Sequence, residues 1–267
     1  MQPEEHPRRR LRLAIPAAAF VVLLLVVGVA VLLSLRQSLS PAHRETLPKK
    51  TYTGLSKLAV DVNSADVTLQ PGTGRSIVVE RSLTWNNDRP SVRVEKSGDT
   101  LDVGSEGCRS GIDFGFTTCR VKITVTLPAT MPVSLRIDSG DARVSGLSGA
   151  LKAHMSSGNL RLSRMSGAID ADVDSGDLIG DEISSATVHA ESSSGDLRFE
   201  FGAAPDRVVA RSSSGDVNLR LPRISAGYAI STDVSSGDRR VPASHNGSPH
   251  RLDLAADSGD VTVDYAD

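Results

Sequence analysis

The chain has 267 residues, a formal net charge of −2 at pH 7, and aromatic side chains at only 3% of its positions. The length allows one or two domains. The near-zero charge offers no overall field for nucleic acid, and the scarcity of rings argues against stacking platforms for bases or sugars.

A long apolar segment lies near the N-terminus. Residues 13–35 carry no charge over 23 positions, and as a helix they would extend roughly 34 Å, enough to cross a bilayer. Four arginines lie within residues 8–12, whereas only Arg36 closely follows the segment. This asymmetry predicts a cytoplasmic tail at residues 1–12, a transmembrane helix at 13–35 and an extracytoplasmic remainder, so the membrane is an expected partner.

A cleaved signal peptide is the competing interpretation of this segment. Signal peptides have an apolar region of about 7–15 residues and a small-x-small cleavage site. The run here is longer and ends at Leu35 without such a site, which favours an uncleaved anchor. Residues 36–50 are polar and contain two prolines, so we expect a linker there, followed by an extracytoplasmic domain at 51–267.

The first part of this domain looks irregular. Alternating apolar residues surround Ser64-Ala65-Asp66, and an irregular insertion at about residues 70–132 follows. Lys96-Ser97-Gly98-Asp99 has the composition of a hairpin turn. The strand-like runs inside the insertion are Ile77–Leu83, Val92–Glu95, Leu101–Val103 and Val121–Leu127.

The two cysteines, Cys108 and Cys119, lie inside this insertion. Their spacing fits neither a Cys-x-x-Cys redox pair nor a common zinc pattern. In an oxidising compartment we therefore expect a disulfide that closes the base of a loop.

Short corners recur along residues 133–265. Each is Ser-Gly-Asp or, once, Ser-Gly-Asn, with glycine-to-glycine steps of 18, 18, 19, 20, 22 and 22 residues. Such a period indicates stacked structural repeats, of which Ser64-Ala65-Asp66 is a degenerate copy. The corner residues are Gly140, Asp141, Gly158, Asn159, Gly176, Asp177, Gly195, Asp196, Gly215, Asp216, Gly237, Asp238, Gly259 and Asp260.

Apolar residues alternate with polar ones before and after each corner, which predicts two half-buried strands per repeat. We therefore expect an all-β fold, a β-solenoid resembling a parallel β-helix with coils of about 18–22 residues. A sandwich of antiparallel hairpins is the alternative, but it would need a tight turn at both ends of each strand pair. Arg239 breaks the apolar pattern, so its coil should be distorted or lie near an open edge.

Stacking would place the corner acids in one column, where neighbouring carboxylates repel one another. Either calcium ions bridge the coils or backbone amides bind each carboxylate in an Asx-type turn. Asn159 favours the second explanation, because asparagine can make the turn but brings no negative charge. We therefore predict structural corners with no metal and no cofactor.

No catalytic constellation is evident in the sequence. His154 and His189 fall on outward strand positions two coils apart, as expected for solvated surface residues. The serine-rich corners lack a base and an orienting partner at definable positions. We therefore predict no catalytic residues.

The anchor, the repeated corners and the Leu127-Pro128 strand end resemble the putative adhesin domain family of bacterial envelope proteins, over about Leu55 to Tyr265. The resemblance implies a β-solenoid of unknown function at the cell envelope, with some relatives linked to envelope-stress responses. It implies no catalytic residues. We expect a non-enzymatic binding, adhesion or scaffolding role, with cell-wall or envelope proteins as candidate partners and not nucleic acid. A β-helix polysaccharide-active enzyme and a membrane-docked solenoid polymer are the alternatives.

Overall fold

The computed structural model describes residues 22, 24–30, 42–107 and 118–266. The chain divides into two units, one of residues 1–41 with 112–117 and one containing the other residues. Residues 22 and 24–30 of the first unit are helical. Among the described residues, no helix is both long and apolar enough to cross a membrane. The predicted tail at 1–12 and most of the predicted span at 13–35 lie outside the described residues.

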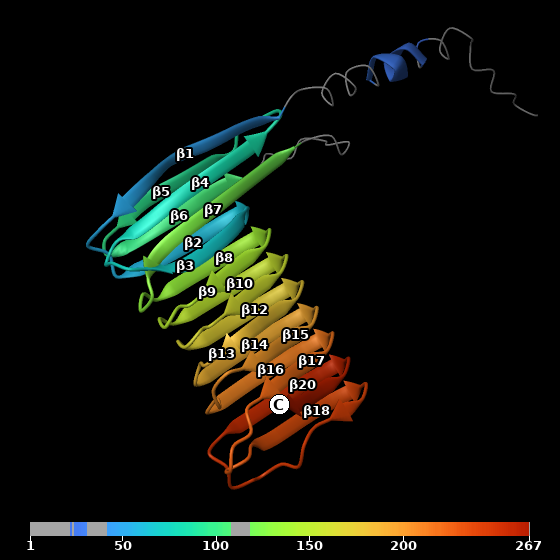
Figure 1. Ribbon diagram of the computed structural model, residues 1–267. Coiled ribbons are helices and arrows are strands. Elements are labelled where there is room, and N and C mark those ends of the chain that lie inside the picture. The colour runs from blue at the N-terminus through green and yellow to red at the C-terminus, as the bar shows by residue number, and fades with distance from the viewer. Residues whose placement is uncertain (1–21, 23, 31–41, 108–117, 267) are drawn as a thin grey trace, which may run out of the picture. The chain divides into compact units, whose positions relative to one another are not determined.

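The second unit is built from two mixed β-sheets, so the predicted all-β class is confirmed (Figure 1). Sheet A contains, in spatial order, β1 (His43–Tyr52), β4 (Ile77–Trp85), β7 (Cys119–Pro128), β3 (Asp66–Gly72), β9 (Ala142–Ser145), β11 (Leu160–Ser163), β13 (Leu178–Ile183), β15 (Leu197–Phe201), β17 (Val217–Leu221), β21 (Val261–Tyr265) and β19 (Arg239–Arg240). Sheet B contains β18 (Ala229–Ser236), β20 (Arg251–Ser258), β16 (Arg207–Ser214), β14 (Thr187–Ser194), β12 (Ile169–Ser175), β10 (Leu151–Ser157), β8 (Val133–Ser139), β2 (Lys57–Ser64), β6 (Thr100–Gly107) and β5 (Ser91–Ser97).

Each repeat contributes one strand to each sheet. From β8 onward, every strand pairs in parallel with the same strand of the neighbouring repeats, as Leu151 pairs with Ile169 and Leu160 with Leu178. The alternating apolar residues of both sheets point inward and form one continuous core. This pairing is that of a solenoid-like repeat, and the hairpin sandwich is excluded for these strands.

The spatial order of the last coils departs from the sequence order. β16 pairs with β20, and β20 in turn pairs with β18. The final repeat is therefore inserted between the two that precede it, and the β18–β19 coil lies at the end of the array (Figure 1). β19 is only two residues long and is the last strand of sheet A, so the predicted edge position of Arg239 is confirmed.

The predicted irregular insertion contains a further coil. All the predicted strand runs lie in β4, β5, β6 and β7, and β5 forms an antiparallel hairpin with β6 at Gly98, as expected. However, β6 also pairs in parallel with β2, and β7 with β3. β6 and β7 therefore stack on the degenerate repeat as another coil.

The predicted linker at 36–50 is wrong from His43 onward. β1 begins there and pairs antiparallel with β4 as the outermost strand of sheet A. Most β1 side chains are exposed, so this strand lacks the apolar alternation that identifies a strand in sequence. Pro48 falls in the irregular stretch between Leu47 and Lys50, where a proline is tolerated on an edge strand.

Candidate functional site

The corner glycines adopt a backbone conformation that other residues rarely adopt. Their φ angles range from 118° at Gly158 to 145° at Gly237 and Gly259. A Cβ atom added to Gly158 would also lie 2.1 Å from the carbonyl oxygen of Gly140 in the preceding coil. The glycine is therefore required both by its own φ and by the close approach of the adjacent coil.

The corner acids form a ladder between coils. The backbone N–H of Asn159 donates to Asp141 Oδ1 at 3.0 Å, and that of Asp177 donates to Asn159 Oδ1 at 3.0 Å. The pattern continues through Asp196 and Asp216 and then follows the spatial order, because Asp260 donates to Asp216 and Asp238 donates to Asp260. A backbone amide thus binds each of these side chains, as predicted. However, the amide belongs to the neighbouring coil and not to a local Asx turn.

The cysteine segment is only partly described. Cys119 begins β7 and pairs across the sheet with Trp85, whereas Cys108 lies outside the described residues. The loop between them connects β6 of sheet B to β7 of sheet A. The disulfide between Cys108 and Cys119 stays a prediction.

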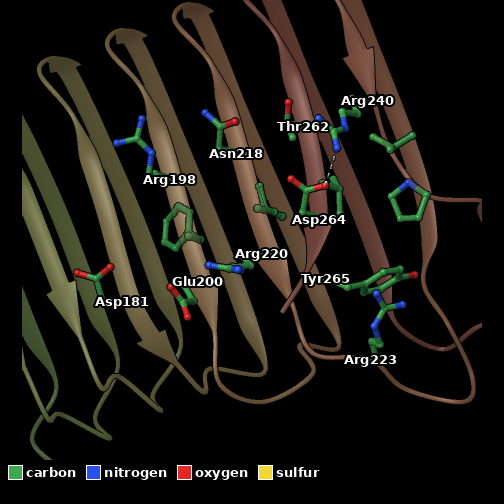
Figure 2. Close-up of a pocket in the computed structure, with 15 residues that line it drawn as sticks. Asp181, Arg198, Glu200, Asn218, Arg220, Arg223, Arg240, Thr262, Asp264 and Tyr265 are labelled. Carbon is green, nitrogen blue, oxygen red and sulfur yellow. Dashed lines mark ion pairs between the residues drawn. The ribbon is translucent and has the colours of Figure 1, made fainter. Parts of the chain in front are cut away.

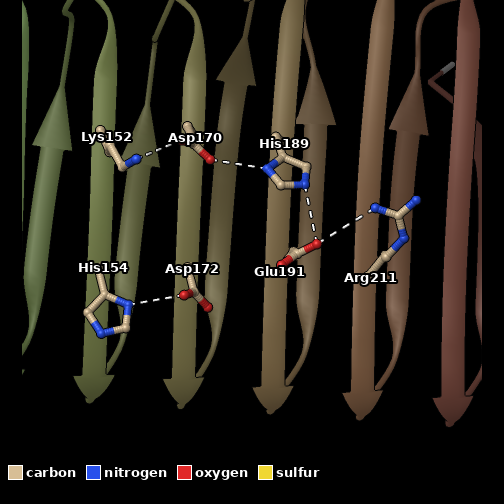
Figure 3. A network of polar contacts seen from close by, with 7 residues as sticks. All are labelled: Lys152, His154, Asp170, Asp172, His189, Glu191 and Arg211. Atoms are coloured by element: carbon tan, nitrogen blue, oxygen red, sulfur yellow. Dashed lines mark hydrogen bonds and ion pairs between the residues drawn. The ribbon is translucent and has the colours of Figure 1, made fainter.

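The outward face of sheet B carries a chain of paired charges (Figure 3). His189 Nδ1 lies 3.1 Å from Asp170, and its Nε2 lies 3.3 Å from Glu191. Further contacts extend this chain to Lys152 at one end and, through Arg211, to Asp253 at the other. The predicted outward position of His189 is correct, but its ring is held between carboxylates of two coils instead of being merely solvated.

His154 lies on the same face, and its Nδ1 is 3.1 Å from Asp172. One ligand-type atom from each of His154, Asp172 and Asp174 could approach a common ion, because these atoms lie within 4.8 Å of one another. Both aspartates are exposed, and Asp172 already contacts His154 Nδ1. We therefore assign no metal to this cluster.

A hollow of about 910 Å³ lies on the outward face of sheet A, over β13, β15, β17, β21 and β19 (Figure 2). The hollow arises because β19, an edge strand of sheet A, is only two residues long. The pairing between β19 and β21 ends at Arg240 and Thr262, after which the chain continues through Val241 and Pro242. Proline has no N–H with which to extend the ladder, so the rest of β21 has no strand partner on this side.

Two rows of polar side chains cross the floor of the hollow. Register partners make up the first row, which contains Arg198, Asn218, Thr262 and Arg240. Glu200, Arg220 and Asp264 make up the second row. Arg198 lies 3.5 Å from Asp196 of its own corner, and Arg240 lies 3.9 Å from Asp264. The side chains of Arg198 and Arg240 are 56% and 80% exposed, so both can reach a ligand.

Arg223 and Tyr265 form one wall of this hollow (Figure 2). The guanidinium carbon of Arg223 lies 4.8 Å from the centroid of the Tyr265 ring, a cation–π contact. The Tyr265 ring in turn lies 6.3 Å from that of Tyr228, which is fully buried. The wall is therefore backed by the core and is not a free-standing loop.

Burial also changes the acidity of Tyr228. Loss of solvent, with a smaller contribution from Tyr265, raises the pKa of the Tyr228 hydroxyl to about 12. The hydroxyl donates a hydrogen bond to the Pro222 carbonyl oxygen at 2.8 Å. Tyr228 stays neutral at physiological pH and serves as a packed support for Tyr265.

The sequence reading did not identify the hollow. A signal for part of it was present, because the third residue after four of the seven corner glycines is arginine, namely Arg143, Arg161, Arg198 and Arg240. These positions face outward on sheet A. In contrast, the gathering of Arg223, Pro242 and Tyr265 depends on the exchanged order of the last coils, which no local pattern indicates.

Residues 168–264, which include most of the hollow, match the family model described as Toastrack DUF4097. This segment is similar to a Toastrack domain. The expected resemblance to a putative adhesin domain family is thereby confirmed, although the match begins at residue 168 and not near Leu55. No curated protein matches the chain.

Solved structures similar to this chain include a putative cell adhesion protein from Clostridium sporogenes, with 14% identity and a TM-score of 0.41 over 85% of this chain and 100% of that one. A putative adhesin from Bacteroides fragilis has 12% identity and a TM-score of 0.41 over 83% and 97%. A putative lipid binding protein from Parabacteroides distasonis has 13% identity and a TM-score of 0.34 over 86% and 98%. No functional conclusion follows from similarities at these scores.

Proposed function

We propose that this protein is a non-catalytic binding protein of the bacterial cell envelope. In this proposal, residues 13–35 anchor the chain in the membrane and the two-sheet array stands outside. Adhesion, scaffolding or envelope-stress signalling would be the process that the binding serves.

The observation that carries the proposal is the form of the hollow on sheet A. It is a polar depression spread over several coils of the outer face and not an enclosed cavity (Figure 2). Small-molecule sites are usually concave, mostly apolar clefts that bury most of their ligand. An open polar depression on rigid strands instead suits a large partner that lies along the surface.

The N-terminal sequence supports the membrane part of the proposal. The uncharged run at 13–35 is long enough to span a bilayer, and the arginines within 8–12 favour a cytoplasmic N-terminus. A binding surface on the array would then face the cell wall or its equivalent.

Cosedimentation with purified cell-wall material tests the proposed function. The full-length protein is reconstituted in nanodiscs and compared with nanodiscs that contain only residues 1–50. We expect the full-length protein to pellet with the wall material. We also expect the polymers of the wall material to keep their length. Equal pelleting of both samples, or shortening of the polymer, would contradict a non-catalytic binding role.

A further inference from the structure

We infer that the sheet A hollow binds an anionic glycan, meaning a polyhydroxylated chain that bears carboxylate or phosphate groups. This inference rests on the proposed binding function and names its ligand class. Three features of the hollow support it, namely its balance of charges, its donors and acceptors, and the way Arg223 is held.

The charge of the hollow favours an anion. Four arginines line it, Arg198, Arg220, Arg223 and Arg240, against the carboxylates of Asp181, Glu200 and Asp264. Arg198 is additionally paired with a corner aspartate, and Arg240 with Asp264. Arg223 contacts the Tyr265 ring, and no carboxylate within the described ranges neutralises it. Its charge is therefore available to a ligand.

Arg223 is also held ready to bind. Its guanidinium lies over Tyr265, and Tyr265 packs against the buried Tyr228. This cation–π contact uses no hydrogen bond, so the N–H groups of the guanidinium remain able to donate. A planar guanidinium donates paired hydrogen bonds to carboxylate or phosphate oxygens. The wall therefore presents a preorganised anion contact.

The remaining lining suits hydroxyl groups. A sugar hydroxyl both donates and accepts, so its site needs both kinds of partner. Asp181, Glu200 and Asp264 supply acceptors, and Asn218 and Thr262 can act as either. The small number of rings does not oppose this ligand, because the Tyr265 ring positions Arg223 and is not required to stack on a sugar.

Other large partners fit the hollow less well. A protein interface would be expected to have an apolar centre depleted of charges, whereas the floor here is crossed by charged rows. Single-stranded nucleic acid is usually bound by several aromatic side chains in a strongly basic groove. Only two lining residues are aromatic, Phe199 and Tyr265, and Phe199 faces inward.

The test measures binding of full-length protein in nanodiscs to three probes by calorimetry. The probes are oligogalacturonate, which carries carboxylates, a glycerol phosphate oligomer, which carries phosphates, and neutral dextran. We expect at least one anionic probe to bind about tenfold more tightly than dextran, with affinity falling as salt is added. The stronger anionic probe identifies which group the ligand carries.

Arg223→Gln should weaken binding of the preferred probe by about tenfold, because it removes a charge-assisted contact. Arg198→Gln provides a second variant on the opposite side of the hollow. Arg211→Gln on sheet B is the matched control and should leave binding unchanged. Binding of neither anionic probe, equal binding of dextran, or full affinity in both hollow variants would overturn the inference. Wall binding in the cosedimentation test without binding of either anionic probe would sink the glycan inference while leaving the proposed function intact.

Discussion

At each corner of the array, one glycine and one acid or amide side chain connect neighbouring coils. The glycine lets the carbonyl group of the preceding coil approach closely, and the side-chain oxygen accepts an N–H from the following coil. Ala65, in the degenerate copy, is not among the residues with positive φ. The repeat motif is therefore a stacking device, which explains its regularity without assigning it a ligand.

Replacing a corner glycine should destabilise the array. In Gly158→Ala, the new methyl group would sit 2.1 Å from the Gly140 carbonyl oxygen at a φ of 118°. We expect a loss of at least about 2 kcal/mol of unfolding free energy, measured by denaturant titration. Gly247→Ala is the control, because nothing lies within 4 Å of the added methyl group. Equal stability of the two variants would contradict the corner account.

The ladder predicts different outcomes for two substitutions of Asp177. Its Oδ1 accepts the Asp196 N–H at 3.1 Å. Asp177→Asn retains an oxygen acceptor, as Asn159 does in the natural column. It should therefore leave the stability nearly unchanged. Asp177→Ala leaves the amide without that acceptor and should cost about 1–2 kcal/mol in a thermal melt. Chelator should not change the melting temperature of the natural chain, and a large drop would instead support calcium between the coils.

Tyr228 predicts a loss of stability in alkali. Its folded pKa of about 12 lies above the ordinary value of 10, so the fold favours the neutral hydroxyl. The contribution is complete below pH 10 and is lost as the pH rises towards 12, by on the order of 2 kcal/mol. The unfolding free energy is measured between about pH 9 and 12, a range that covers the titration of this hydroxyl. It should fall less steeply with pH in Tyr228→Phe than in the natural chain. Parallel curves for both proteins would count against this role.

At the scale of elements, the sequence predicts where individual strands lie in the chain much better than it predicts which strands are adjacent in a sheet. Alternation identifies β10 or β12 because one face of each is buried. It misses β1, whose side chains are mostly exposed. It also cannot reveal that β20 lies between β16 and β18, because all three carry equivalent patterns. The hollow was missed for the same reason, since its wall depends on that order.

The positions of the two cysteines predict a covalent link between the sheets. Cys108 follows the end of β6 in sheet B, and Cys119 begins β7 in sheet A. Thiol titration of the unfolded, unreduced protein should find no free thiol. Reduction should then release two thiols per chain and lower the melting temperature. Free thiols before reduction, in protein isolated from an oxidising compartment, would disprove the disulfide.

At the scale of the whole molecule, the two outer faces differ in how their charges are used. On sheet B, the described charges largely pair with one another across the coils (Figure 3). On sheet A, the arginines around the hollow include Arg223, which has no acidic partner among the described residues (Figure 2). Binding is therefore assigned to sheet A, which must then be displayed outside the membrane.

Labelling of intact cells with a membrane-impermeant maleimide tests this display most directly. Ser166 is exposed between β11 and β12 and does not line the hollow, and Gln2 lies in the predicted cytoplasmic tail. The natural chain serves as the background control for its own cysteines. We expect Ser166→Cys to be labelled in intact cells and Gln2→Cys to be labelled only after lysis. Labelling of Gln2→Cys in intact cells, with Ser166→Cys protected until lysis, would contradict the account.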